Sequence, residues 1–188
     1  VEAETATGRL SGGGASLGAG HGLSGILQRY RRAFPPVELN VIEDSGEYLQ
    51  HLLIGGELDV AVLLTSSVHD RMALNVETLL VSPYRLWLPL GHPLAQQESI
   101  ALEELAGSPM IQLMVDEIEE STRRLTAALP VKPQIAFRTR SVEAVRSLVA
   151  TGAGLAILPS LVYRPWSLEG DRIEIRDVSG DLPSVQVG

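Results

Sequence analysis

The sequence predicts an α/β protein, because apolar runs of strand length alternate with amphipathic runs of helix length. The clearest example begins at the apolar run Val37–Ile42, which a serine-bearing turn separates from leucines at helical spacing. The pair Gly55–Gly56 then ends the helix, and a second apolar run follows at Leu58–Leu64. Strand, helix and strand within about thirty residues form a βαβ unit, which implies parallel strands. The second half of the chain repeats this alternation, so we expect two similar α/β lobes.

Further elements are predicted on either side of this unit. A glycine-diluted strand is predicted at Leu10–Ala15. A helix is predicted at Leu23–Phe34, where apolar residues recur every three or four positions and a proline pair ends the pattern. Two more strands are predicted at Ala73–Val81 and Tyr84–Leu90, separated by Ser82–Pro83.

The second half of the chain has its own start and stop signals. Ser141 is a suitable N-cap for the last helix, and Gly152 is a suitable residue just past its end. The predicted elements are a short helix at Ser99–Leu105 with Ser99 as N-cap, a strand at Met110–Met114, a helix at Asp116–Leu129, a strand at Gln134–Thr139, a helix at Ser141–Thr151, and strands at Gly154–Leu158 and Ile173–Val178.

Composition restricts the function classes. The 188 residues are 45% hydrophobic and 20% charged, as in ordinary globular proteins. The net charge of −8 disfavours strong binding of DNA or an anionic membrane by this chain alone, because phosphate contacts need clustered Lys and Arg. The chain contains no Cys, which excludes a disulfide scaffold, a Cys-ligated metal and a thiol nucleophile. No apolar run reaches the length of a membrane span, and the first residues lack the pattern of a signal peptide.

Four stretches occur in a characteristic order and cover most of the chain. They are FPPVELNVIEDSGEYLQHLLIGGELDVAVLL (Phe34–Leu64), YRLWLPLGHPLA (Tyr84–Ala95), SIALEELAGSPMIQL (Ser99–Leu113) and SVEAVRSLVATGAGLAILPSLV (Ser141–Val162). Together they resemble the effector-binding domain of LysR-type transcriptional regulators. In that family, motifs similar to PPVEL and GELDVA occupy the first lobe, HPLA marks passage into the second, and the last stretch lies late in the second lobe.

The resemblance implies the type 2 periplasmic-binding-protein fold, an α/β fold of two Rossmann-like lobes joined by two crossover strands, with a ligand cleft between the lobes. On this pattern, residues 1–82 form lobe I, residues 83–171 form lobe II, and residues 172–188 return to lobe I. The crossovers are expected near Val81–Leu88 and Arg172–Val178. The family also carries a winged helix-turn-helix and a linker helix ahead of this domain. Neither is present here, so we expect a fragment cut at both ends.

The resemblance also implies partners. It implies a cytoplasmic transcription regulator with a small organic or inorganic anion as effector, no cofactor, no membrane, and DNA contact only through the absent N-terminal domain. It implies a homodimer of this domain and a tetramer of the full-length protein, with the helix at Leu23–Phe34 as the candidate dimer element. Two alternatives stay open. The apolar face of that helix can be wholly intramolecular core, and the chain can be a periplasmic solute-binding protein of a transporter.

The candidate effector-binding residues follow predicted strands, where helix N-termini point in a parallel sheet. Backbone N–H groups and serine hydroxyls at such places bind carboxylates and other oxyanions without a lysine. A serine N-cap also stabilises its helix by about 1 kcal/mol, so capping alone is an alternative role. The candidates are Ser16, Leu17, Ser45, Thr65, Ser66, Met114, Ser141 and Val142.

The sequence offers little for catalysis or metal binding. The four histidines lack the i, i+4 spacing with an intervening Glu that zinc proteases use. Asp44, Glu47 and Glu57 are candidates for acid–base work, but Glu47 falls in the first turn of a predicted helix and Glu57 precedes a strand. We therefore expect a binding domain and not an enzyme, with no catalytic residue and no metal ligand.

Overall fold

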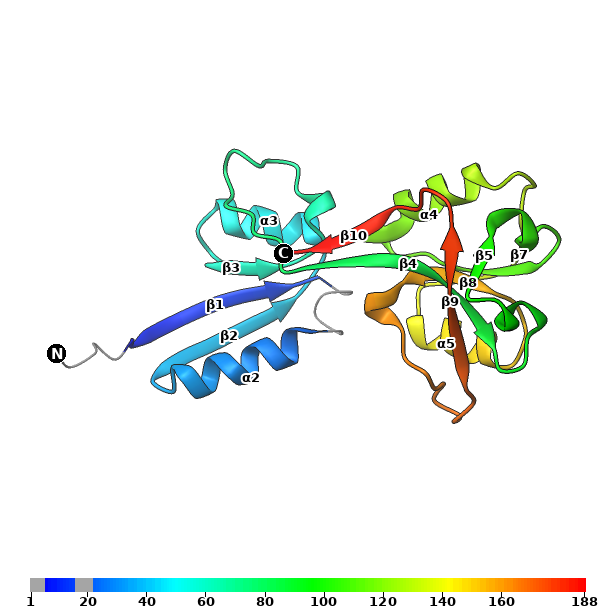
Figure 1. The fold of residues 1–188 in the computed structure, drawn as a ribbon. Coiled ribbons are helices and arrows are strands. Elements are labelled where there is room, and N and C mark those ends of the chain that lie inside the picture. The colour runs from blue at the N-terminus through cyan, green and yellow to red at the C-terminus, as the bar shows by residue number, and fades with distance from the viewer. Residues whose placement is uncertain (1–5, 16–21) are drawn as a thin grey trace. The chain divides into compact units, whose positions relative to one another are not determined.

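The computed structural model describes residues 6–15 and 22–188, except for the side chains of Asp116 and Glu117. The chain divides into two compact units (Figure 1). The first unit contains Val1–Val81 and Gln186–Gly188, and the second contains Ser82–Val185. The chain therefore passes from one unit to the other twice.

The first unit contains a three-stranded sheet in which β1 is the central strand. The order is β2-β1-β3, and β1 pairs in parallel with both neighbours. Its strands are β1 (Gly8–Gly14), β2 (Val37–Glu43) and β3 (Val60–Val62). The predicted βαβ unit is confirmed, although the third strand is shorter than the apolar run Leu58–Leu64.

Helix α3 (Gly46–Ile54) covers one face of this sheet tightly. Ser45 caps the helix, because its Oγ accepts a hydrogen bond from the backbone N–H of Tyr48 at 3.3 Å. The predicted glycine stop is confirmed, and Gly56 has φ +77°, a conformation that favours glycine. Leu49 and Leu52 pack into a core whose other buried members are Ala15, Leu58, Leu63 and Val68.

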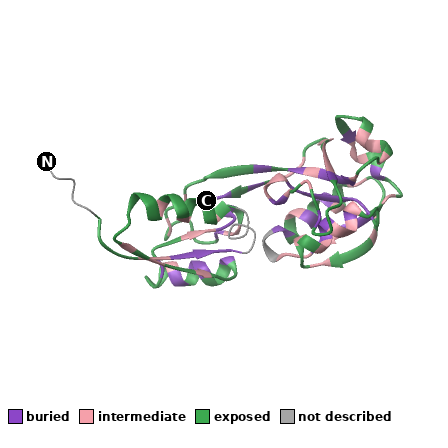
Figure 2. Cartoon of the chain, turned by 90° about the horizontal axis from the view of Figure 1, so that it is seen from below, coloured by how far each residue is buried: buried purple, intermediate pink, exposed green. Residues whose placement is uncertain are grey.

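Helix α2 (Ser24–Ala33) covers the other face loosely. The predicted helix is confirmed, yet none of its residues is buried (Figure 2). Its apolar side chains nevertheless lie on the side of the helix that faces the sheet. Leu23, Ile26, Leu27 and Tyr30 line a hollow whose opposite wall is the sheet. The apolar face of α2 therefore lies toward the helix's own sheet. This arrangement resembles the intramolecular alternative for Leu23–Phe34, except that none of the helix residues is buried.

The main sheet of the second unit has the order β10-β4-β9-β5, with β8 also paired to β4. Strand β4 pairs antiparallel with β8 and β9, whereas β5 pairs in parallel with β9. Trp87, Leu86 and Leu88 of β4 are fully buried. The strands are β4 (Leu80–Pro89), β5 (Ser99–Ala101), β8 (Ala156–Pro159), β9 (Ile173–Ser179) and β10 (Ser184–Val187).

A second, two-stranded parallel sheet lies in the same unit. It is formed by β6 (Pro109–Leu113) and β7 (Gln134–Thr139), with helix α4 (Asp116–Ala128) between them in sequence. Helix α5 (Val142–Ala150) follows β7 and buries Val145 and Val149. These four elements agree with the sequence-based predictions to within two residues at either end.

Two predicted elements are wrong. The predicted strand at Ala73–Val81 is turn and irregular chain as far as Leu79, and β4 then runs unbroken through Ser82–Pro83. The predicted helix at Ser99–Leu105 is the short strand β5 followed by a 3₁₀ helix, Leu102–Leu105. Ser99 is therefore no N-cap. Glu104 instead accepts a hydrogen bond from the backbone N–H of Ala101 at 2.8 Å.

The second crossover also differs from its expected place. Strand β9 pairs with β4 and β5 inside the second unit, so residues 172–178 do not carry the chain back. The chain re-enters the first unit at Gln186, within β10. There the backbone N–H groups of Leu63 and Gly188 donate to each other's carbonyl oxygens at 3.0 and 3.1 Å.

Gly12 and Gly13, two of the three adjacent glycines of β1, generate a prediction about packing. A Cβ at Gly13 would lie 2.5 Å from Leu49 Cδ2 and 3.1 Å from Leu58 Cδ1. A Cβ at Gly12, on the opposite face, would lie 3.7 Å from its nearest atoms. Gly13→Ala should therefore lower the free energy of unfolding by about 1–3 kcal/mol, because both leucines are buried and must shift. Urea denaturation measures this, with Gly12→Ala as the matched control. Equal stability of the two variants would contradict the tight packing of α3.

Tyr84 of β4 generates a prediction about alkaline pH. Burial raises the pKa of Tyr84 to about 12, and the neighbouring Ser121 hydroxyl partly offsets this. Its stabilising contribution is complete below pH 10, the ordinary pKa of tyrosine, and is lost as the pH rises from 10 to about 12. The loss should be about 2–3 kcal/mol. Denaturation across this range should show a larger loss in the wild type and in Tyr48→Phe, whose ring is exposed, than in Tyr84→Phe, where Tyr163, whose pKa burial also raises, still contributes. A parallel slope in Tyr84→Phe would assign the loss to other groups.

Candidate functional site

The first unit presents one candidate edge, where β1, β2 and β3 all end. Because the strands are parallel, their carboxyl ends meet there, and α3 begins beside them. The backbone N–H of Asp44 donates to Gly14 O at 3.3 Å, which links the ends of β2 and β1. The Asp44 carboxylate in turn accepts a hydrogen bond from the backbone N–H of Ser45 at 2.7 Å. An acidic side chain of the protein thus already occupies part of this helix N-terminus.

Gln50 joins the start of α3 to the turn after β3. Its side chain is buried, and its Nε2 donates to Gly46 O at 3.0 Å and to Ser67 O at 2.9 Å. Its Oε1 accepts a hydrogen bond from the backbone N–H of His69 at 3.0 Å. One side chain therefore holds Ser45 and the Thr65–Ser67 turn at the same edge.

Thr65 and Ser66 form part of this turn, a 3₁₀ helix at Thr65–Ser67. Thr65 is buried, and its hydroxyl donates weakly to Gln186 O at 3.4 Å. Its carbonyl accepts a hydrogen bond from the Arg71 guanidinium at 2.9 Å. Ser66 is exposed. Thr65 therefore has a structural role, and of the two residues only Ser66 presents its side chain to solvent.

The second unit presents another edge, where β6 and β7 end. The backbone N–H of Met114 donates to Thr139 O at 2.7 Å, which brings Met114 beside Ser141 and Val142 at the start of α5. Ser141 caps α5, because its Oγ accepts a hydrogen bond from the backbone N–H of Ala144 at 3.2 Å. The predicted cap is confirmed. A ligand role for these three residues stays a prediction.

The charge near the two helix N-termini differs. Glu43, Asp44 and Glu47 surround the start of α3, so an anion there meets like charge. Arg138 and Arg140 lead into α5. The same edge also carries Asp116 and Glu117, the first residues of α4, so by sequence it is the less acidic of the two edges.

The one acidic residue in the first turn of α5, Glu143, has an internal partner. Glu143 pairs with the guanidinium of Arg146, which also donates to Val162 O at 2.7 Å. Burial lowers the pKa of Arg146, and the Glu143 carboxylate opposes that shift. The Glu143 charge is thus compensated from within the helix, so it does little to repel an anion at Ser141.

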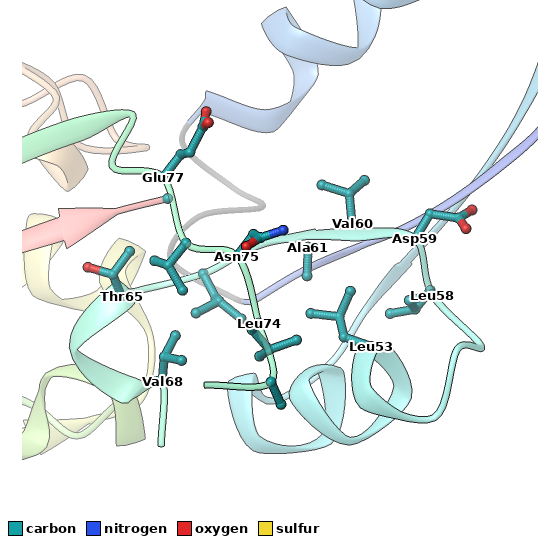
Figure 3. Close-up of a pocket in the computed structure, with 14 residues that line it drawn as sticks. Leu53, Leu58, Asp59, Val60, Ala61, Thr65, Val68, Leu74, Asn75 and Glu77 are labelled. Atoms are coloured by element: carbon teal, nitrogen blue, oxygen red, sulfur yellow. The ribbon is translucent and has the colours of Figure 1, made fainter. Parts of the chain in front are cut away.

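A pocket of about 240 Å³ lies elsewhere in the first unit (Figure 3). Thr65 is the one predicted site residue that lines it. Most of the lining is aliphatic, and Asp59 and Glu77 lie on different sides of it (Figure 3). Two carboxylates and no cationic side chain among the described residues make this pocket unsuited to an anion.

The predicted site residues thus fall into two groups. Ser45, Thr65 and Ser66 lie together in the first unit, and Met114, Ser141 and Val142 lie together in the second. Ser16 and Leu17 lie outside the described residues. Sequence reasoning missed Gln50. The only signal was a polar residue on the buried side of an amphipathic helix.

Within residues 6–15 and 22–188, no group of three or more His, Cys, Asp or Glu side chains is placed to hold a metal ion. No helix in the same part of the chain is long and apolar enough to cross a membrane.

Comparison with known families assigns the domain. The sequence profile of the LysR substrate binding domain matches residues 3–188. The chain belongs to the LysR substrate-binding-domain family. The predicted resemblance is thereby confirmed.

Curated relatives of this LysR domain are transcriptional regulators. The regulator AlsR of Bacillus subtilis is 29% identical over 147 residues, covering 77% of this chain and 48% of AlsR. TtuA of Agrobacterium vitis is 31% identical over 71% of the chain and 45% of TtuA. A hydrogen peroxide-inducible genes activator of Dickeya chrysanthemi is 29% identical over 72% of the chain and 44% of its own length. The chain therefore spans about half the length of these relatives.

Solved structures confirm the fold. A LysR family regulator from Pseudomonas aeruginosa matches all of the chain and 66% of its own with a TM-score of 0.86 at 25% identity. The C-terminal domain of a probable LysR family regulator from Rhodococcus also gives 0.86, at 24% identity, over 97% of this chain and 89% of that one. The reduced form of OxyR gives a TM-score of 0.74 at 25% identity, over 98% of this chain and 86% of that one. The predicted type 2 periplasmic-binding-protein fold is therefore confirmed.

The bridge made by Gln50 generates a prediction. Gln50→Leu keeps the side-chain volume but leaves the His69 N–H and the Ser67 carbonyl without this partner. The free energy of unfolding should fall by about 1–3 kcal/mol, the usual cost of unsatisfied buried polar groups. Denaturation by urea measures it, with Gln28→Leu on the exposed side of α2 as the control, expected within about 0.5 kcal/mol of wild type. If both variants were equally stable, the bridge would not contribute to stability.

Proposed function

We propose that this LysR domain is the sensor of a transcription regulator and that its effector is a small organic or inorganic anion. The observation that carries the proposal is the start of α5, where the Ser141 hydroxyl and the first backbone N–H groups of the helix lie at the carboxyl edge of β6 and β7, directly after Arg138 and Arg140 in sequence. The first N–H groups of a helix lack partners within the helix, and its dipole favours negative charge. The names of the relatives support the regulatory role and count against a transporter protein or an enzyme.

The residues differ in what they contribute. Ser141 supplies a hydroxyl, Val142 supplies a backbone N–H, and Met114 forms the neighbouring wall. Ser45 and Ser66 offer similar groups in the first unit, but acidic neighbours weaken them as anion ligands. We therefore rank Ser141 above Ser45 as an effector-binding residue.

Thiol oxidation is an alternative to ligand binding as the stimulus. Some relatives are named as hydrogen peroxide-inducible activators, and one similar structure is of a reduced form. A thiol switch needs a cysteine, and this 188-residue chain contains none. Ligand binding is thus favoured over thiol oxidation as the stimulus for this domain.

We further propose that the regulator acts as a homodimer of this domain within a tetramer and binds DNA through a separate N-terminal domain. The net charge of −8 supports a separate DNA-binding part, since this domain alone would be repelled by phosphate. Effector binding would change the arrangement of the two units, because the chain passes between them twice. An effector can do so only through different affinities for the two arrangements.

A calorimetric comparison tests the anion site. A thermal-shift screen of small carboxylates, sulfate and phosphate first identifies a ligand. Ser141→Ala should then weaken its affinity by about 2- to 12-fold, the effect of one hydrogen bond. Ser45→Ala is the matched control and should change the affinity less, although each substitution removes a helix cap.

Two results would contradict the proposal. If no anion in the screen raises the melting temperature of the wild type, an anionic effector is rejected. If Ser141→Ala binds the identified anion as tightly as the wild type does, Ser141 is removed from the site. The melting temperature of each variant, measured without ligand, separates lost binding from lost folding.

A further inference from the structure

The hollow beneath α2 is large and almost wholly apolar. It has a volume of about 360 Å³ and lies between α2 and the face of the β2-β1-β3 sheet that α3 does not cover. Every described lining residue is aliphatic or glycine except Tyr30, and no charged side chain among them lines it. Ile26 and Val60, on opposite walls, remain 37% and 48% exposed. A helix and a sheet that face each other normally bury such side chains, whereas no side chain of the described residues fills this hollow, which is open to solvent.

Gly12 adds to the space, because it presents no side chain to the hollow. It is buried in the middle of β1, at the level of Val41 on one side and Val60 on the other. A Cβ at Gly12 would lie 3.7 Å from Val60 Cγ1 and 3.9 Å from Val41 Cγ2, which is ordinary van der Waals contact. Neither a close approach nor a left-handed φ therefore requires glycine here. Glycine in a strand interior weakens the strand and leaves the sheet without a side chain at this point.

Gly13 makes the contrast clear. It faces α3, and the 2.5 Å approach of a Cβ to Leu49 explains why no larger residue stands there. The same strand is thus closely packed on one face and open on the other. On the open face, the described residues leave apolar surface that no side chain among them covers.

The outer surface of α2 argues against a second copy as the occupant. The side of the helix that faces away from the sheet presents Gly25, Gln28, Arg29 and Arg32, all exposed. The apolar side chains instead face the sheet across the hollow. A partner protein would meet the polar side of α2, whereas a small molecule can enter the space between helix and sheet.

We propose that this hollow binds a small, uncharged, apolar molecule of one or two aromatic rings. A dry apolar cavity of about 150 Å³ is known to hold benzene, so the volume here is sufficient. A charged ligand would lose its hydration without gaining a counter-charge. The Tyr30 hydroxyl offers a single polar contact. The site lies wholly within the first unit and is separate from the anion edge at α5, so each can fail without the other.

Toluene is the probe for the test, with methyl NMR and thermal unfolding as readouts. In the wild type, toluene should shift the methyl signals of Ile26, Leu27 and Val60 and raise the melting temperature. The signals of Leu49 and Leu52, on the other face of the sheet, should move little. Gly12→Val should weaken toluene binding by about tenfold or more, because its side chain takes up volume that the ring needs.

Two variants keep the test decisive. Gly12→Ala places one methyl group in the hollow and should weaken toluene binding by less than Gly12→Val does. Gly12→Ala takes the place of Gly12→Val in the test if Gly12→Val fails to fold. Gly25→Ala makes the same chemical change on the outer side of α2 and should leave binding unchanged. The proposal is overturned if toluene leaves the three methyl signals unmoved in the wild type, or if Gly12→Ala and Gly25→Ala bind toluene equally well.

Discussion

The parallel pairing of β1 with both of its neighbours is the constraint on which the first unit depends. Parallel strands cannot be joined by a tight turn, so the chain between them must cross a face of the sheet, usually as a helix. Both faces of a parallel sheet are therefore normally covered. Here α3 covers one face closely through Leu49, and α2 covers the other at a distance. Gly12 and Gly13 of β1 stand on these two faces, and packing requires a glycine only at position 13.

The same constraint explains where the polar groups gather. Parallel strands end at one edge, and the helices that follow them begin there. In the first unit this edge carries Asp44 and the Gln50 bridge, so its hydrogen-bonding groups are largely used within the protein. In the second unit the edge at Ser141 follows Arg138 and Arg140. Similar topology thus produces two edges with serine caps but with different charged residues nearby in sequence, and this difference is the basis for the proposed preference of an anion for the second edge.

The domain combines features that suit a sensor. Its two units are each compact and exchange the chain only at the crossovers within β4 and β10. Its net charge of −8 disfavours contact with DNA phosphates, and the longer relatives are named as transcriptional regulators. Its polar edge and its apolar hollow are chemically different surfaces.

The sequence by itself determined the features that depend on neighbouring residues. The α/β class, the Gly55–Gly56 stop, and the Ser141 cap follow from local periodicity, backbone conformation and capping. The motifs also identified the family. Tertiary structure alone decided the features that depend on distant partners. Ser99–Ala101 is a strand because it pairs with Asp177–Ser179, and Gln50 acts as a bridge because the turn after β3 lies beside it. No local signal carries such information, because the partner that satisfies a backbone or side-chain group is chosen only when the chain has folded.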